Sequence, residues 1–176
     1  IANARLNANW QQGQRPQATL SISSDNGELT QQTEQPLTMT WQQLNLSSKL
    51  SDDTLQSSLT LVLSDETRLD ATTNITQLQT DNRQLAGNVR LTRFALNVLQ
   101  PLLGEFSELK GELSSELELA GSLDQPLLNG QVDISGVRVK GKQAPVDIDD
   151  ADITLTLSGQ QARLQGLVTT AKGEIK

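Results

Sequence analysis

The chain has 176 residues, a formal net charge of −7, no Cys, no His and no Tyr, and aromatic residues make up only 2% of it. Nucleic acid is excluded as a partner because a phosphate backbone needs a clustered basic surface, and the 14 Lys and Arg residues are dispersed. The same charge balance gives no attraction to an anionic membrane surface. Without Cys, the chain has neither a disulfide framework nor a thiolate metal site.

Catalytic side chains are scarce. Without His and Cys, the chain cannot form a Ser–His or Cys–His nucleophile pair, and zinc would have to be held by carboxylates alone. The densest acidic cluster, four Asp residues between positions 147 and 152, lacks the glycine pivot and distal Glu of a calcium loop. Its spacing fits the solvated face of a strand. We therefore expect no enzyme activity, no metal and no cofactor.

No targeting or membrane segment is evident in the sequence. No run approaches the roughly 18 apolar residues that a membrane-spanning helix needs, and no signal peptide leads the chain. The first residue is Ile1 rather than Met. We expect the chain to be a segment of a longer protein.

Apolar and polar residues alternate along most of the chain, which is the pattern of strands with one apolar and one polar face. The turns between them recur at about the 8–12-residue spacing of a meandering antiparallel sheet. In order, strands are predicted near residues 1–10, 18–23, 29–33, 37–41, 44–50, 55–63, 68–75, 85–91, 109–121, 131–139, 146–157 and 162–168.

Two local features qualify this pattern in the first half of the chain. The Asn26–Gly27 pair predicts a reversal of the chain, because Asn-Gly tolerates the positive φ angles of hairpin turns. The adjacent Gln42 and Gln43 change the parity of the apolar positions by one, so we expect a bulge or a tight bend there.

The alternation breaks between residues 92 and 106, where apolar residues recur at spacings of three and four. This spacing predicts one short amphipathic helix around 93–104 in an otherwise all-β chain. Pro101 removes a backbone donor, so the helix should kink there or restart with Pro101 in its first turn. Gly104 is a suitable end for it.

The stretch from Leu109 to Lys140 carries the clearest strand signal. Leucines occupy one side of its first half and Lys, Ser and Glu the other, and a polar turn at residues 122–126 leads into a second strand of the same kind. After Gly136 the apolar positions resume one residue later. We expect a long hairpin with one apolar and one polar face.

The residues alone leave two architectures open for these one-sided strands. A sandwich of two sheets or a small closed barrel would hide the apolar faces against each other. A packed core normally uses large aromatic residues, however, and this chain has two Trp and two Phe. Smooth aliphatic positions interspersed with Ala and Gly are more typical of a lipid groove.

The segment Leu102–Gly166 resembles the C-terminal region of the TamB family, which is grouped with AsmA-like proteins. The resemblance is carried by residues 119–123, LAGSL, by residues 125–130, QPLLNG, and by the Ala144–Pro145 step before the amphipathic strand through Ile153. It covers the second half of the chain specifically, and the Gln- and Leu-rich first half is compatible with it.

The resemblance implies a long antiparallel sheet curled into an open, taco-like groove with an apolar interior. It implies that residues 1–176 form one continuous segment, with a subdivision considered near 92–106. The whole protein would lie in the periplasm, anchored in the inner membrane by an N-terminal helix outside this segment. Its implied partners are TamA, an Omp85-type barrel of the outer membrane, phospholipid acyl chains, and unfolded outer-membrane proteins or autotransporters.

Our leading hypothesis for function is a hydrophobic conduit that supports outer-membrane biogenesis by phospholipid transport. Each methylene kept from water contributes about 0.8 kcal/mol, so a continuous lining would ease transfer. The alternatives are a scaffold that helps autotransporters and outer-membrane proteins insert by strand addition to open sheet edges, and a structural spacer. The predicted lining consists of Leu6, Leu20, Ile22, Met39, Trp41, Leu46, Leu59, Leu61, Leu63, Leu69, Val89, Leu91, Leu113, Leu117, Leu119, Val132, Ile134, Val139, Ile153, Leu155, Leu157 and Leu164.

Overall fold

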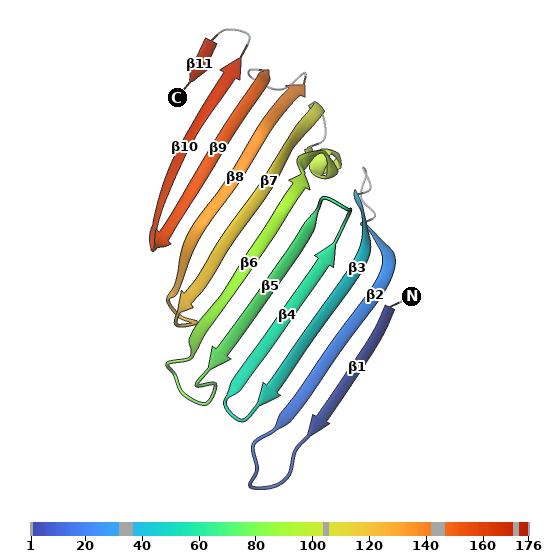
Figure 1. Cartoon of the computed structure of the whole chain (residues 1–176), viewed down its shortest axis with the longest axis vertical. Coiled ribbons are helices and arrows are strands. Elements are labelled where there is room, and N and C mark those ends of the chain that lie inside the picture. Colours follow the sequence, from blue (N-terminus) through green and yellow to red (C-terminus); the bar gives the residue numbers. More distant parts are fainter. Residues whose placement is uncertain (1, 32–36, 104–105, 142–146, 171–172, 176) are drawn as a thin grey trace.

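The computed structural model describes residues 2–31, 37–103, 106–141, 147–170 and 173–175, which form one antiparallel sheet of 11 strands. Each strand pairs with the strands before and after it in the sequence (Figure 1). The strands are β1 (Ala2–Asn9), β2 (Gln17–Gln31), β3 (Leu37–Ser51), β4 (Thr54–Val62), β5 (Arg68–Thr76), β6 (Gln84–Ala95), β7 (Phe106–Gly121), β8 (Pro126–Gly141), β9 (Ile148–Gly159), β10 (Gln161–Thr170) and β11 (Gly173–Ile175). The prediction of an all-β, open and curled antiparallel sheet is confirmed.

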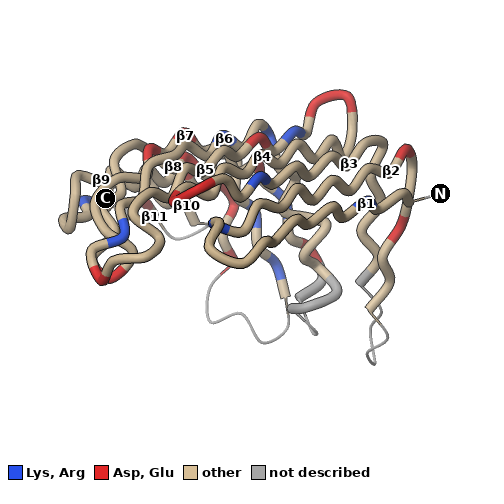
Figure 2. Tube along the Cα trace, turned by 90° about the horizontal axis from the view of Figure 1, so that it is seen from below, with Lys and Arg blue, Asp and Glu red and all other residues tan. Residues whose placement is uncertain are grey.

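The sheet is a single layer and does not close on itself. β1 and β11 lie at opposite ends of it, and the view from below shows one layer of strands (Figure 2). Among the described residues, the buried apolar side chains are Leu109, at 8% exposure, and Ala151, at 2%. A two-layer sandwich would bury many more, so the described chain does not form the closed core that the residues alone had left open.

The long hairpin predicted between Leu109 and Lys140 is confirmed. It consists of β7 and β8, which pair antiparallel from Phe106 opposite Gly141 to Gly121 opposite Pro126. In the turn between them, the backbone N–H of Gln125 donates a hydrogen bond to Ser122 Oγ at 3.1 Å. The polar turn and the alternating strands therefore follow directly from the local sequence.

Bulges occur where the spacing of apolar residues changes from two to three. The β6–β7 register shifts between Leu91 and Phe94, and the β7–β8 register shifts opposite Gly136, as expected from the step in the pattern there. The β9–β10 register shifts between Ile148 and Asp150, and the β7–β8 register shifts again between Phe106 and Glu108. Each extra residue keeps the following apolar side chains on the same face, since a slip of one residue would otherwise turn them over.

The predicted reversal at Asn26–Gly27 is wrong, because β2 continues through both residues. Asn26 does adopt a positive φ of 54°, but Gly27 does not, whereas a type I′ turn needs positive φ at both positions. The indole of Trp41 lies over Gly27, and a Cβ there would approach Trp41 Cζ2 to 2.3 Å. This glycine makes room for a side chain of the neighbouring strand β3.

The parity change at Gln42 and Gln43 is visible in the exposures, but the bulge or tight bend predicted there is absent, because β3 runs through both residues and keeps one register with β2 on either side of them. Both glutamines are exposed, while Trp41 before them and Leu44 after them are half-buried. Gln42 Nε2 donates a hydrogen bond to Asp65 Oδ1 at 3.3 Å. β3 therefore carries half-buried apolar residues both before and after the two glutamines.

The helix is shorter than predicted and of a different type. It is a 3₁₀ helix, η1 (Leu96–Leu103), and the expected first residues 93–95 belong to β6. Phe94 pairs with Leu113 of β7, and the carbonyl of Arg93 accepts a hydrogen bond from Thr67 Oγ1 at 2.7 Å. These partners hold the segment in the sheet. η1 then contacts β7 and β3, and the predicted end at Gly104 lies outside the described residues.

Candidate functional site

The register of the sheet gathers the apolar residues on one face, because residues directly opposite each other on paired strands point to the same side. One line of such partners, which we call the central row, crosses ten strands from β1 to β10 and contains only apolar residues and one glycine. The central row is Ala4, Ile22, Leu46, Leu59, Ala71, Val89, Leu117, Gly130, Leu157 and Ala162.

Further rows run parallel to the central row on the same side, which we call the apolar face. A row on one side of it is Leu44, Leu61, Leu69, Leu91, Ser115, Val132, Leu155 and Leu164. Beyond that, across β6 to β9, lie Phe94, Leu113, Ile134 and Ile153. Near the opposite strand ends lie Ala8, Ala18, Leu50, Leu55, Ile75 and Leu85.

Fifteen of the 22 predicted lining residues fall into these rows, and six others lie elsewhere on the strands. Leu6 pairs with Leu20, Leu119 with Leu128, and Val139 with Leu109. Met39 and Trp41 lie on the part of β3 that extends past the end of β4. Leu63 lies beyond the last residue of β4, outside any strand, and is the exception.

The rows also contain apolar residues that the predicted lining omitted. Their alternation was visible in the sequence, but only the strand register shows that they join the same rows. They are Ala4, Ala8, Ala18, Leu44, Leu50, Leu55, Ala71, Ile75, Leu85, Phe94 and Ala162.

The apolar face is not covered by a second layer of the described chain. Most of its side chains are half-buried by their neighbours in the sheet, and those on outer strands are more open: Leu6 is 68% and Leu164 is 69% exposed. Exposed apolar surface on this scale is characteristic of an interaction or ligand-binding site.

A hydrogen bond between Trp41 and Ser24 lies near one end of the apolar face. Trp41 Nε1 donates a hydrogen bond to Ser24 Oγ at 3.2 Å, and Ser24 is only 3% exposed. The contact gives the indole N–H a partner while its ring lies over Gly27 of β2. The bulkiest apolar side chain in this region is therefore oriented along the sheet.

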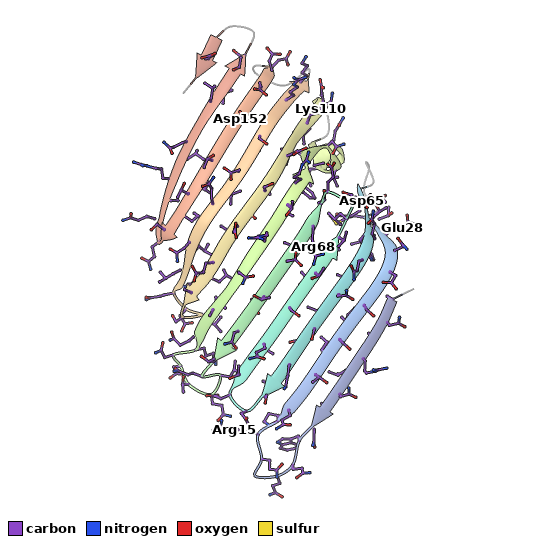
Figure 3. The ribbon with its side chains drawn as sticks, viewed as in Figure 1. Arg15, Glu28, Asp65, Arg68, Lys110 and Asp152 are labelled. Atoms are coloured by element: carbon purple, nitrogen blue, oxygen red, sulfur yellow. The ribbon has the colours of Figure 1, made fainter. Side chains whose placement is uncertain are left out.

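The opposite face is polar and carries the ion pairs. Arg90 pairs with Glu116 across β6 and β7, and Arg93 makes a bidentate contact with Glu112 at 3.0 and 3.1 Å. Labelled charges on different strands lie far apart over the sheet (Figure 3). Because the arginine hydrogen-bonds the carboxylate, the pKa of Glu112 lies below its usual value.

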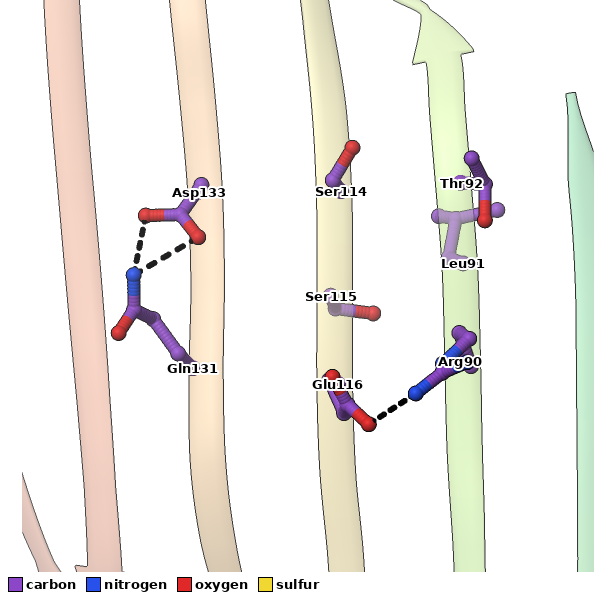
Figure 4. A pocket seen from close by; sticks show the side chains of 8 residues that line it. All are labelled: Arg90, Leu91, Thr92, Ser114, Ser115, Glu116, Gln131 and Asp133. Carbon is purple, nitrogen blue, oxygen red and sulfur yellow. Dashed lines mark hydrogen bonds and ion pairs between the residues drawn. The ribbon is translucent and has the colours of Figure 1, made fainter. Parts of the chain in front are cut away.

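A shallow depression of about 500 Å³ lies on the sheet around Arg90, Glu116, Gln131 and Asp133. Gln131 Nε2 donates to Asp133 Oδ1 at 2.7 Å, and Leu91 lies on the far side of the ribbon from these polar groups (Figure 4). The charged groups pair with each other, as on an ordinary solvated strand face. These contacts link neighbouring strands: Arg90 with Glu116 joins β6 to β7, and Thr154 donating to Asp133 joins β9 to β8.

The described residues contain no group of three or more potential metal ligands of the His, Cys, Asp or Glu type. Among the helices of the described ranges, none is long and apolar enough to cross a bilayer.

Fold and face together define the class: a single-layer, open antiparallel sheet with one continuous apolar face. The family model described as "TamB, N-terminal domain" matches residues 1–134. The chain therefore belongs to the TamB family. Translocation and assembly module subunit TamB of Haemophilus influenzae is 37% identical over 94 residues, which are 53% of this chain and 7% of that protein. No solved structure matches the chain.

The family match corrects the predicted location within the family. The resemblance of the second half pointed to the C-terminal region, whereas the matching model is that of the N-terminal domain. One-sided strands and polar turns recur along the whole sheet. A pattern that repeats from strand to strand therefore identifies the family, but it does not identify which region of a family member the segment corresponds to.

Proposed function

We propose that this chain is a segment of a hydrophobic conduit that carries phospholipid acyl chains between the inner and outer membranes, as part of a translocation and assembly module. The observation that carries the proposal is the central row, an apolar line across ten strands on a face that no second layer of described strands covers. Family membership supports the connection with the module, because the Haemophilus influenzae relative is named as its subunit.

The dimensions of the central row suit an acyl chain lying across the strands. Nine strand spacings of about 4.8 Å give a length of about 43 Å. One leaflet of a bilayer is about 15 Å of hydrocarbon, half of its roughly 30 Å core. An acyl chain can therefore shift along the row while its methylenes stay in apolar contact, each contributing about 0.8 kcal/mol.

The proposal includes the location and the partner. The whole protein would lie in the periplasm and be anchored in the inner membrane by a helix outside this segment. TamA would receive the far end of the conduit at the outer membrane. Crosslinking the full-length protein to TamA in cells tests this part, and an absence of crosslinks along the whole protein would contradict it.

Charges introduced on the apolar face test the conduit. Leu117→Arg and Ile153→Asp each place a charge where the acyl chain would lie, at a cost of about 2.5–3.5 kcal/mol in hydrocarbon. Phospholipid that co-purifies with the chain, measured by mass spectrometry, should fall more than tenfold, since tenfold corresponds to about 1.4 kcal/mol. Lipid transport between the membranes should fall with it.

The controls carry the same charges on the polar face. Asn88, on β6 beside the strand of Leu117, and Thr156, on the same strand as Ile153, are exposed. Asn88→Arg and Thr156→Asp should leave bound phospholipid unchanged. Equal lipid content in all four variants, or none in the wild-type chain, would refute the conduit. The second outcome would favour the structural spacer.

The alternative is a scaffold for autotransporter and outer-membrane protein insertion by strand addition. One observation favours it: β3 pairs with β4 only from Gln43 onward, so the preceding residues of β3 have strand partners on the β2 side alone, although the short helix η1 also contacts β3. Such a strand edge can accept another strand. Proline at positions 38–42 whose N–H points away from β2 should impair client insertion and spare phospholipid binding. The opposite pattern would exclude this mode.

A further inference from the structure

Three hydroxyl side chains interrupt the apolar face at its centre. Ser48 of β3 pairs with Ser57 of β4, and Ser57 pairs with Thr73 of β5, so all three lie side by side on the same face. All three are half-buried. We call them the hydroxyl row.

The hydroxyl row lies between two apolar rows. On one side, the same strands carry Leu46, Leu59 and Ala71 of the central row. On the other side, they carry Leu50, Leu55 and Ile75. A ligand that covers these flanking leucines would also cover the hydroxyls.

Some O–H groups of the hydroxyl row have no acceptor among the described residues. Ser48 Oγ and Ser57 Oγ are 2.9 Å apart, and one of them donates to the other, so the pair keeps one O–H to give. Thr73 Oγ1 has no hydrogen bond to another described residue of the chain. Water can satisfy these donors while the face is open, but hydrocarbon cannot, and burying an unpaired hydroxyl costs free energy.

We propose that the hydroxyl row binds the ester carbonyl oxygens of a diacyl glycerophospholipid, with the acyl chains on the flanking apolar rows. An ester carbonyl accepts hydrogen bonds and cannot donate them. It can therefore accept from the O–H groups of the hydroxyl row that have no acceptor in the described chain. The row would then set where the glycerol region of the lipid pauses along the sheet. This inference rests on the proposed conduit function and adds a polar position to it.

The chain contains a matched control on its other face. Ser47, Ser58 and Thr72 pair in the same order on the same three strands, are of the same residue types, and are all exposed. Removing three hydroxyls on either side therefore changes composition and strand propensity equally. The difference between the two variants reports the face alone.

The experiment compares ester-linked with ether-linked phosphatidylglycerol of equal chain length, which differ in the carbonyls but share the phosphate. Competition for the chain is read by native mass spectrometry. The wild-type chain should prefer the ester lipid about tenfold, the ratio that corresponds to about 1.4 kcal/mol. The inner variant Ser48→Ala/Ser57→Ala/Thr73→Val should bind both lipids equally, whereas Ser47→Ala/Ser58→Ala/Thr72→Val should keep the preference.

The ratio of the two lipids is the measured quantity, because the inner variant also makes the face more apolar and raises its affinity for any hydrocarbon. Equal binding of both lipids by the wild-type chain would overturn the ester assignment and leave the conduit intact. So would an equal loss of both lipids in the inner variant, which would indicate phosphate as the bound group. Binding of neither lipid by the wild-type chain would overturn the conduit as well.

Discussion

Replacing Gly130 with Ala tests how closely β7 and β8 approach within the central row. Gly130 has a φ of +129°, and a Cβ there would lie 2.0 Å from the carbonyl oxygen of Glu116 on β7. The backbone conformation costs a non-glycine residue about 1–3 kcal/mol. Moving the carbonyl away weakens roughly two ladder hydrogen bonds at about 0.5–1.5 kcal/mol each. After subtracting about 0.4–1 kcal/mol for the less flexible unfolded chain, we expect a total loss of about 1–6 kcal/mol.

Gly136→Ala in the same strand is the control. Gly136 also has a positive φ, of +61°, but no atom lies within 4 Å of the Cβ position. The Gly136→Ala variant should lose about 1–2 kcal/mol because alanine disfavours the left-handed conformation. It should regain about 0.4–1 kcal/mol because the unfolded chain becomes less flexible. Urea unfolding followed by circular dichroism measures both variants. The close approach at Gly130 would be refuted if the two variants had the same urea midpoint and the same dependence of unfolding free energy on urea concentration.

Two further predictions concern single polar contacts. Arg68 hydrogen-bonds Asp70 and lowers the pKa of that carboxyl below its usual value. The pair therefore stabilises the fold above the usual Asp pKa, and the stabilisation is lost as the pH falls through the lowered pKa. Asp70→Asn should flatten the acid side of a plot of thermal midpoint against pH, and an unchanged plot would contradict the pairing. Ser24→Ala leaves the Trp41 N–H without its acceptor and should cost about 1–3 kcal/mol. Unchanged urea unfolding together with unchanged Trp41 fluorescence would refute that contact.

Alternation along a single strand was enough to predict most of the fold, and a change in alternation predicted one of its irregularities. The step after Gly136 marks a place where β7 and β8 depart from regular pairing. The doubled Gln42–Gln43 marks two consecutive exposed residues, and the β2–β3 register does not shift there. The step after Gly136 is a local signal, because an extra residue must appear in the sequence of the strand that bulges. It requires no knowledge of partner strands.

Two of the wrong local predictions have a common cause in long-range packing. Asn26–Gly27 carries the composition of a turn, but its glycine is needed under Trp41, a residue of the next strand. The helical spacing near Phe94 was overruled by pairing with Leu113, 19 positions further along the chain. The residues around Gly27 and around Phe94 do not indicate which distant residue each will contact.

The candidate site was predicted as a set of residues, but its arrangement depends on register. The rows, the hydroxyl row between them and the position of Leu63 beyond β4 all follow from which residue faces which across strands. The pairing of β3, β4 and β5 is consistent with short turns, yet a slip of one residue in any turn would turn over a whole strand. Sequence alone therefore predicted the apolar side chains and left their geometry open.

Because each strand pairs with its neighbours in the sequence, the sheet behaves as a one-dimensional array. Short-range contacts of this kind favour rapid folding that can spread from hairpin to hairpin. Adding or deleting one strand would reverse the direction of every strand that follows, whereas adding or deleting two changes the length by about 9.6 Å and leaves the rest in place. The sheet can therefore be lengthened in evolution by whole hairpins, because each added pair of strands keeps the direction of the strands that follow.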